Sequence, residues 1–149
     1  NNNYQFAQSP GHVMILVEMN HNVRTLRIDA EPLPAQIQPW FGDSLARWEG
    51  DTLVVETTQF HSQQFLRLAI KHQVMMGDNT QVTERFTRIS ENEIVYEFTV
   101  SDDELYSEDW RGEMTMRKSE GPIYEYACHE GNYGLPNILA GARQEEQED

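Results

Sequence analysis

The chain has 149 residues, a formal net charge of −14 and a sequence pI near 4.6. This length is typical of one domain, and the 11 Lys and Arg against 25 Asp and Glu argue against a nucleic-acid partner or an anionic membrane surface. The longest apolar run, residues 13–17, is too short to span a bilayer.

The first half of the chain reads as strands separated by turns and one long loop. It opens on "NNNYQFAQSPGH", without a starting methionine or signal peptide, so we expect a mature or excised segment. Residues 12–19 and 23–29 predict strands, whereas the proline-rich residues 31–40 predict an extended loop because proline removes ladder donors. Residues 44–60 predict a hairpin whose turn is "EGD" at 49–51.

The second half predicts one helix, two hairpins and a tail. Residues 62–77 roughly follow helical spacing and predict one short helix. Residues 82–100 alternate apolar and polar side chains about the turn "SENE", which predicts a hairpin. Residues 113–128 predict another hairpin, whose returning strand is 123–128, and the acidic residues 144–149 predict a mobile tail.

These elements predict an all-β fold. About seven short antiparallel strands form a meander, which must curl or close to remove its edges and bury its apolar face. We therefore expect a barrel or strongly curled sheet over residues 1–143, similar in style to lipocalins and calycins by analogy of architecture only.

The stretch "YEYACHEGNYG" at 124–134 carries the candidate catalytic residues His129, Glu130 and Tyr133. A histidine at a strand end could act as a general base oriented by a carboxylate, or could instead bond the backbone of a turn. Cys128 is a poor nucleophile candidate, because its neighbour His129 would point to the opposite face of a strand. The five histidines show no metal-ligand spacing, so no metal is predicted and no cofactor is identified.

Aromatic residues near strand ends are the candidates for ligand binding. Trp110, after an acidic loop, could line the mouth of a barrel with Arg111, and Trp48 beside a hairpin turn is a second tryptophan candidate. The alternatives are an ordinary core aromatic for Trp48 and a rim salt bridge near Trp110. Tyr124 and Tyr126 share one strand face, so they could present hydroxyl groups to a ligand together with Arg117.

The opposite orientation of that strand stays open. If Tyr124 and Tyr126 face outward, Glu125 points inside and requires a partner such as Arg85, Arg88 or Arg117.

The blocks "RWEGDTLVVETTQF", "ERFTR", "YEFTV" and "YEYACHEGNYGLPNILAGAR" resemble a family of uncharacterised exported proteins from proteobacteria and acidobacteria. The resemblance covers nearly the whole chain and implies a periplasmic or secreted protein with a further N-terminal portion. It also implies that Cys128 could pair with a cysteine in that portion. The chain departs from the family pattern at 60–81, where a longer segment could serve as a lid, a partner surface or a better-packed loop.

Three functions remain open. The first is binding of a small apolar or aromatic ligand within the curled sheet, which predicts an interior cavity. The second is a lyase, isomerase or hydrolase that uses His129 as general base. The third is an accessory subunit whose residues 60–81 or C-terminal tail contact a partner chain, which an ordered tail would favour.

Overall fold

The computed structural model describes residues 3–65, 76–127 and 130–148. The strands are β1 (Tyr4–Ser9), β2 (His12–Val17), β3 (Asn22–Ile28), β4 (Asp43–Glu49), β5 (Thr52–Thr58), β6 (Gln81–Arg88), β7 (Glu93–Ser101) and β8 (Trp110–Arg117). The helical elements are η1 (Met19–His21), η2 (Ser62–Phe65) and α1 (Gly134–Glu148). None of these described helices is both long enough and apolar enough to cross a membrane.

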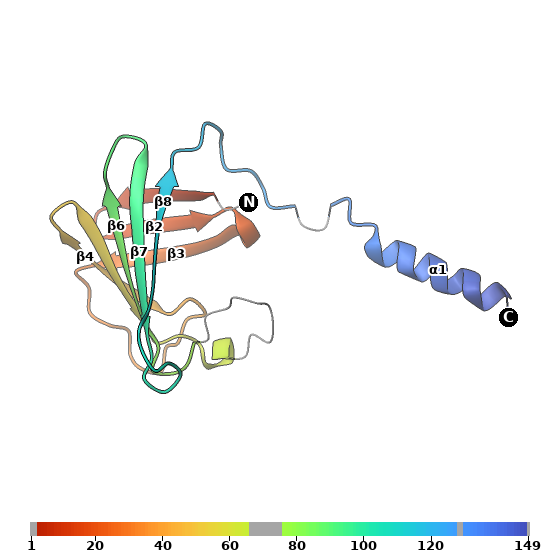
Figure 1. Cartoon of the computed structure of the whole chain (residues 1–149), viewed down its shortest axis with the longest axis horizontal. Helices are drawn as coiled ribbons and strands as arrows, with labels where there is room; N and C mark the ends of the chain where they lie inside the picture. The colour runs from red at the N-terminus through yellow and green to blue at the C-terminus, as the bar shows by residue number, and fades with distance from the viewer. Residues whose placement is uncertain (1–2, 66–75, 128–129, 149) are drawn as a thin grey trace.

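All eight strands form one sheet in which each strand pairs with the next along the chain. The pairings are antiparallel except between β3 and β4, which run parallel through Arg27 opposite Leu45 and Ile28 opposite Ala46. Figure 1 shows the first three strands lying across the longer strands that follow, so the sheet curls into a half-barrel. The predicted all-β meander with a strongly curled sheet is confirmed.

The core lies on the inner face of this curled sheet. Strand register places alternating side chains on that face, as in the pairs Val13 with Leu26 and Leu53 with Phe86. The buried core consists of Val13, Ile15, Leu26, Ala46, Leu53, Val55 and Phe86. Tyr96 and Phe98 of β7 continue the same face, which confirms the period-two interpretation of residues 82–100.

The loop between β3 and β4 crosses over because the two strands are parallel. Its ends are tied together by Arg27, whose Nη2 lies 2.6 Å from Asp43 Oδ1. Asp43 also accepts a hydrogen bond from the Leu33 backbone at 2.8 Å, and Arg27 donates to the Glu31 carbonyl at 2.9 Å. Asp43 is buried, and a buried ion pair needs further hydrogen bonds. Backbone groups of the loop that the pair holds supply these hydrogen bonds.

The predicted returning strand at 123–128 is wrong for the residues that the structure describes. Residues 118–127 form an extended segment, here called the strap, that leaves β8 without pairing in the sheet (Figure 1). Pro122 removes a ladder donor, and the Tyr124 backbone N–H donates instead to Glu18 Oε1 at 3.2 Å. Cys128 lies outside the described residues.

The helices also differ from the prediction. The predicted helix at 62–77 is a 3-10 turn over Ser62–Phe65, and most of the remainder lies outside the described residues. Residues 144–148, predicted as a mobile tail, form the end of the 15-residue helix α1. The sequence signals for this helix are Asn132, whose Oδ1 accepts from the Gly134 N–H at 3.0 Å, and apolar residues at helical spacing from Leu135.

We predict that Gly112→Ala destabilises the fold by about 1–3 kcal/mol. Gly112 lies opposite Phe98, and a Cβ at this position would overlap the Phe98 ring. The measurement is urea unfolding, with Gly121→Ala as the control because a Cβ there meets no atom within 4 Å. Phe98→Leu should relieve most of the cost in the double variant; a cost unchanged by that second substitution would show that the ring contact is not its cause.

Candidate functional site

An aromatic row runs along the inner face from β1 to β8. Its members are Phe6, Phe86, Tyr96, Phe98 and Trp110, and successive ring centroids lie 5.5, 4.8, 5.6 and 5.7 Å apart. These separations are typical of favourable aromatic contacts. The row is therefore a continuous surface built from four strands.

The row passes from the core to the surface. Phe86 is 7% exposed, whereas Trp110 is 46% exposed at the β8 end. Met114 of the same strand is 52% exposed, and Met116 is half-buried. We call the inner-facing residues Phe98, Trp110, Met114 and Met116 the β8 face. This apolar surface lies along an edge strand of the sheet.

A buried polar centre lies beneath the middle of the row. Arg24 of β3 reaches across the inner face and donates from Nη1 to Glu84 Oε1 at 3.0 Å and from Nη2 to Glu84 Oε2 at 2.6 Å. The Tyr96 hydroxyl donates to Glu84 Oε1 at 2.9 Å. Ser44 and Thr57, 2.9 Å apart, each accept from Arg24 Nη2 at 3.2 Å.

The electrostatics of this centre favour a fixed, neutral arrangement. Burial, together with the charge and hydrogen bond of Glu84, raises the pKa of Tyr96 above its ordinary value of 10.0. Burial lowers the pKa of Arg24, but the hydrogen bond and charge of Glu84 outweigh it and leave the Arg24 pKa raised. Tyr96 therefore stays a hydrogen-bond donor, and its ring is held in the aromatic row by its own hydroxyl group.

One donor in the centre has no acceptor. Arg24 Nε is buried and makes no hydrogen bond with any described residue. Both oxygens of the Glu84 carboxylate accept hydrogen bonds within the centre, from Arg24 and from Tyr96. The polar centre is consequently suited to holding five strands, β3 to β7, together, and the exposed end of the row is the part open to a ligand.

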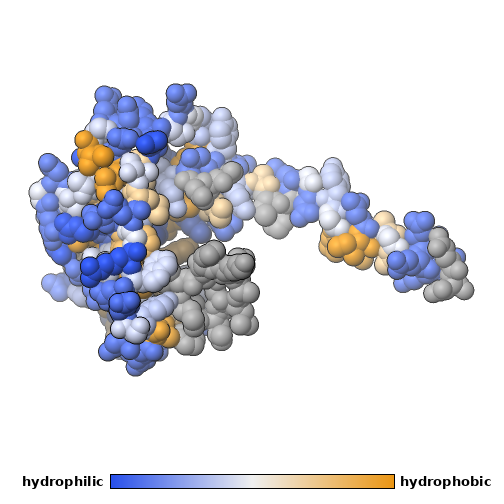
Figure 2. All heavy atoms as spheres, viewed as in Figure 1, coloured by the Kyte–Doolittle hydropathy of each residue, from blue (hydrophilic) through white to orange (hydrophobic). Residues whose placement is uncertain are grey.

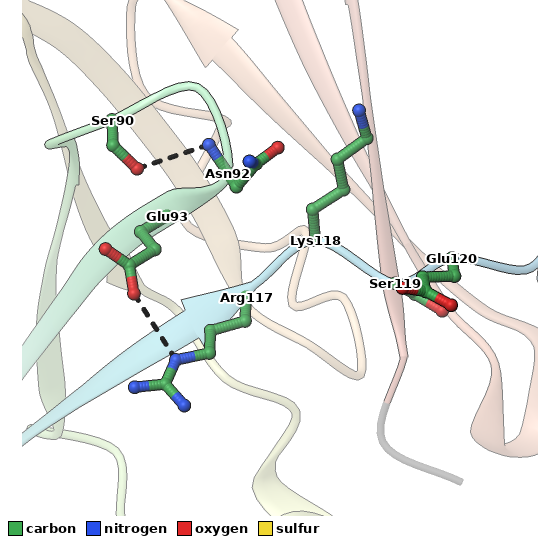
Figure 3. Close-up of a pocket in the computed structure, with 7 residues that line it drawn as sticks. All are labelled: Ser90, Asn92, Glu93, Arg117, Lys118, Ser119 and Glu120. Carbon is green, nitrogen blue, oxygen red and sulfur yellow. Dashed lines mark hydrogen bonds and ion pairs between the residues drawn. The ribbon is translucent and has the colours of Figure 1, made fainter.

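An open pocket lies at the end of β8, next to Met116. Its lining is polar and consists of Ser90, Asn92, Glu93, Arg117, Lys118, Ser119 and Glu120. Figure 3 shows Glu93 and Arg117 facing each other, with Arg117 Nε 3.3 Å from Glu93 Oε1. Lys118 extends away from this pair and forms no ion pair within the described part of the chain. The pocket therefore offers a cation at the end of the β8 face.

The structure separates the predicted ligand-binding residues. Trp110 belongs to the aromatic row, and Arg117 lines the polar pocket at the other end of β8. Trp48 is 47% exposed at the end of β4, and Tyr124 is 67% exposed on the strap. Tyr126 is half-buried and contacts the His21 ring edge-on at 6.4 Å. Trp110 and Arg117 share β8, Tyr124 and Tyr126 share the strap, and Trp48 lies apart from both pairs on β4.

Two of the three predicted catalytic residues, Glu130 and Tyr133, lie beyond the sheet. Glu130 and Tyr133 are exposed between the strap and α1, and Tyr133 is 70% exposed. His129 lies outside the described residues, so its proposed role as general base stays a prediction. Among the described residues, no group of three or more His, Cys, Asp or Glu is placed to hold a metal ion.

Sequence reasoning missed the polar centre. The signal was present, because period-two alternation places Glu84 on the same face as Phe86 and thus toward the core. A buried carboxylate demands a cation, but alternation does not say which one. Arg24 lies 60 positions away, and only the curl of the sheet brings it to Glu84.

Removing the charge of Glu84 should destabilise the fold strongly. Glu84→Gln leaves Arg24 buried without its counter-ion, so we expect a loss of about 3–5 kcal/mol in urea unfolding. Glu49→Gln is the control, because Glu49 forms only exposed ion pairs with Arg47 and Arg85 and its loss should change little. Equal effects of the two substitutions would refute this role for Glu84.

Tyr96 should make stability depend on alkaline pH. The pKa of Tyr96 is raised in the folded state, so the unfolded chain releases the phenolic proton at a lower pH than the folded protein does. The contribution of Tyr96 to stability is therefore complete below about pH 10 and is lost as the pH rises above it. The free energy of unfolding of Tyr96→Phe, measured in urea, should therefore fall less between about pH 9 and 11 than that of the parent protein. Tyr124→Phe, at an exposed position, should keep the parent slope; an unchanged slope in Tyr96→Phe would contradict the assignment.

Comparisons with protein-family models, curated proteins and solved structures found no match. The half-barrel and its aromatic row are therefore described on the geometry of this chain alone. The family resemblance of the sequence blocks stays a prediction.

Proposed function

We propose that this chain binds a small apolar or aromatic molecule on the β8 face. The observation that carries the proposal is the aromatic row, whose inner end is buried in the core and whose outer end, Trp110, is 46% exposed. An apolar surface of this kind, next to a few polar groups, is typical of small-molecule sites.

The local packing supports a flat aromatic ligand. Gly112 leaves no side chain between Trp110 and Met114, and the Phe98 ring lies over the space that a Cβ would fill. Trp110 offers a ring for stacking, and the flexible thioether of Met114 can adapt to different shapes. Tyr96, anchored through Glu84, keeps the floor of this surface rigid before binding.

This proposal places the ligand on an open face, in contrast to the interior cavity expected from the sequence. The residues beneath the centre of the half-barrel are closely packed, since Val13, Leu26 and Val55 are at most 2% exposed. The proposed cellular setting, periplasmic or secreted, rests on the family resemblance of the sequence.

A second candidate function is that of a subunit in an assembly of several chains. The observation that favours it is that α1 extends to Glu148 as a regular helix although residues 134–147 are exposed. An isolated acidic tail has no reason to hold one conformation.

The test of ligand binding uses N-phenyl-1-naphthylamine, a neutral aromatic probe whose fluorescence rises in apolar surroundings. We expect Trp110→Ala to weaken probe binding about 3- to 10-fold, because it removes the exposed ring of the row. Trp40→Ala is the matched control, since Trp40 is 54% exposed but stacks on His61 at 4.1 Å away from the row. The proposal fails if the monomeric protein does not bind the probe or if the two variants lose affinity equally.

A further inference from the structure

Helix α1 carries an apolar stripe that nothing in the described structure covers. Leu135, Ile138, Leu139 and Ala142 follow the i, i+3, i+4, i+7 spacing of one helix face. Leu135, Ile138 and Leu139 are 66, 70 and 46% exposed. Figures 1 and 2 show α1 projecting away from the sheet with hydrophobic residues on its surface.

Such a helix is not expected to be stable by itself. Isolated helices of about 12–15 residues are marginal in water, and α1 has 15 residues. Gly141 lies in its interior, where glycine stabilises a helix less than alanine does. Packing of the apolar stripe against another surface is the usual source of the missing stability.

The same chain carries a matching surface. The β8 face is apolar, and its exposed members Trp110 and Met114 lie on an edge strand with no further strand beside it. Trp110 to Arg117 spans about 23 Å of strand, and Leu135 to Glu146 spans about 16 Å of helix. The stripe can therefore lie along the β8 face within the length of one strand.

The charges at the ends agree with one direction of docking. The apolar stripe of α1 ends in Glu145 and Glu146, close to the negative end of the helix dipole. The β8 face ends at the polar pocket that contains Arg117 and the unpaired Lys118 (Figure 3). Placing the acidic end of α1 at this pocket puts its apolar residues over Met114 and Trp110.

We propose that α1 of one copy of this chain packs on the β8 face of a second copy, with the acidic end of the helix at Lys118, and that the contact is reciprocal. The β8 face of the same chain is a poor target for α1, because contacts with Glu18 and His21 hold the strap away from β8. Glu18 binds the Tyr124 backbone, and His21 contacts Tyr126, at the start of the path that carries α1 outward. A reciprocal exchange is the closed two-fold arrangement that most soluble dimers adopt.

The test is sedimentation velocity of the 17.3 kDa chain over a wide concentration range. We expect a monomer–dimer equilibrium that Leu139→Glu and Met114→Glu each weaken by about 30-fold or more, because each places a charge in the apolar contact. The controls lie on the opposite faces of the same elements: Gln144→Glu on α1 and Thr115→Glu on β8 should leave the dimer intact.

Mixing the two disruptive variants gives the decisive result. The helix of the Met114→Glu chain and the β8 face of the Leu139→Glu chain are both unaltered, so the mixture should form a heterodimer although each variant alone is a monomer. A dimer broken by Leu139→Glu but not by Met114→Glu would mean helix–helix pairing and would overturn the proposal. A parent protein that stays monomeric at every concentration would overturn it as well.

This inference does not rest on small-molecule binding, and the two can fail separately. The dimer covers the β8 face, so Leu139→Glu, which frees that face, should bind the aromatic probe more tightly than the parent dimer. Tighter binding of the probe by Leu139→Glu supports the docking geometry. If the parent protein is shown to be a dimer and yet binds the probe as tightly as Leu139→Glu does, the result argues against that geometry.

Discussion

The contact of β1 and β3 with β6 across the inner face of the sheet is the constraint on which the rest of this structure depends. In a flat sheet β1 and β6 would lie about 24 Å apart, five strand spacings away. The Phe6 and Phe86 ring centroids are instead 5.5 Å apart, and Arg24 of β3 reaches Glu84 of β6 at 2.6 Å. Apolar burial drives this curl. The buried ion pair selects one arrangement of the curl, because any other arrangement would leave a charge in the core without its counter-ion.

Tyr96 connects this constraint to the exposed surface. Its ring stacks between Phe86 and Phe98, while its hydroxyl group is fixed by Glu84. The outer part of the aromatic row is thus built on a residue that the core holds in one position. A surface supported in this way loses little conformational entropy when something packs on it, whether a small molecule or a helix.

The strands and the candidate Trp110 were predictable from the sequence, but the long-range contacts that build the site were not, for one physical reason. Alternation is a local property, so the sequence revealed the hairpins at 44–60 and 82–100 and, for 82–100, which residues share a face. The pairing of β3 with β4 in parallel, the Arg24–Glu84 contact and the departure of the strap from β8 depend on residues far apart in the chain. The strap was misjudged because "IYEYA" alternates as a strand does, although Pro122 and the nearby carboxylate of Glu18 direct it elsewhere.

Glu18 decides where the end of the chain goes. This buried carboxylate accepts from Asn3 Nδ2 at 2.7 Å and from the Tyr124 backbone at 3.2 Å, so it ties the strap to the start of β1. Residues 123–127 therefore cannot pair with β8, whose inner face and edge stay open as a result. The same tie leads the chain outward to α1 and leaves the stripe of that helix uncovered. One hydrogen-bonded carboxylate thus accounts for both unpartnered apolar surfaces, and this common origin is a reason to consider them as partners of each other.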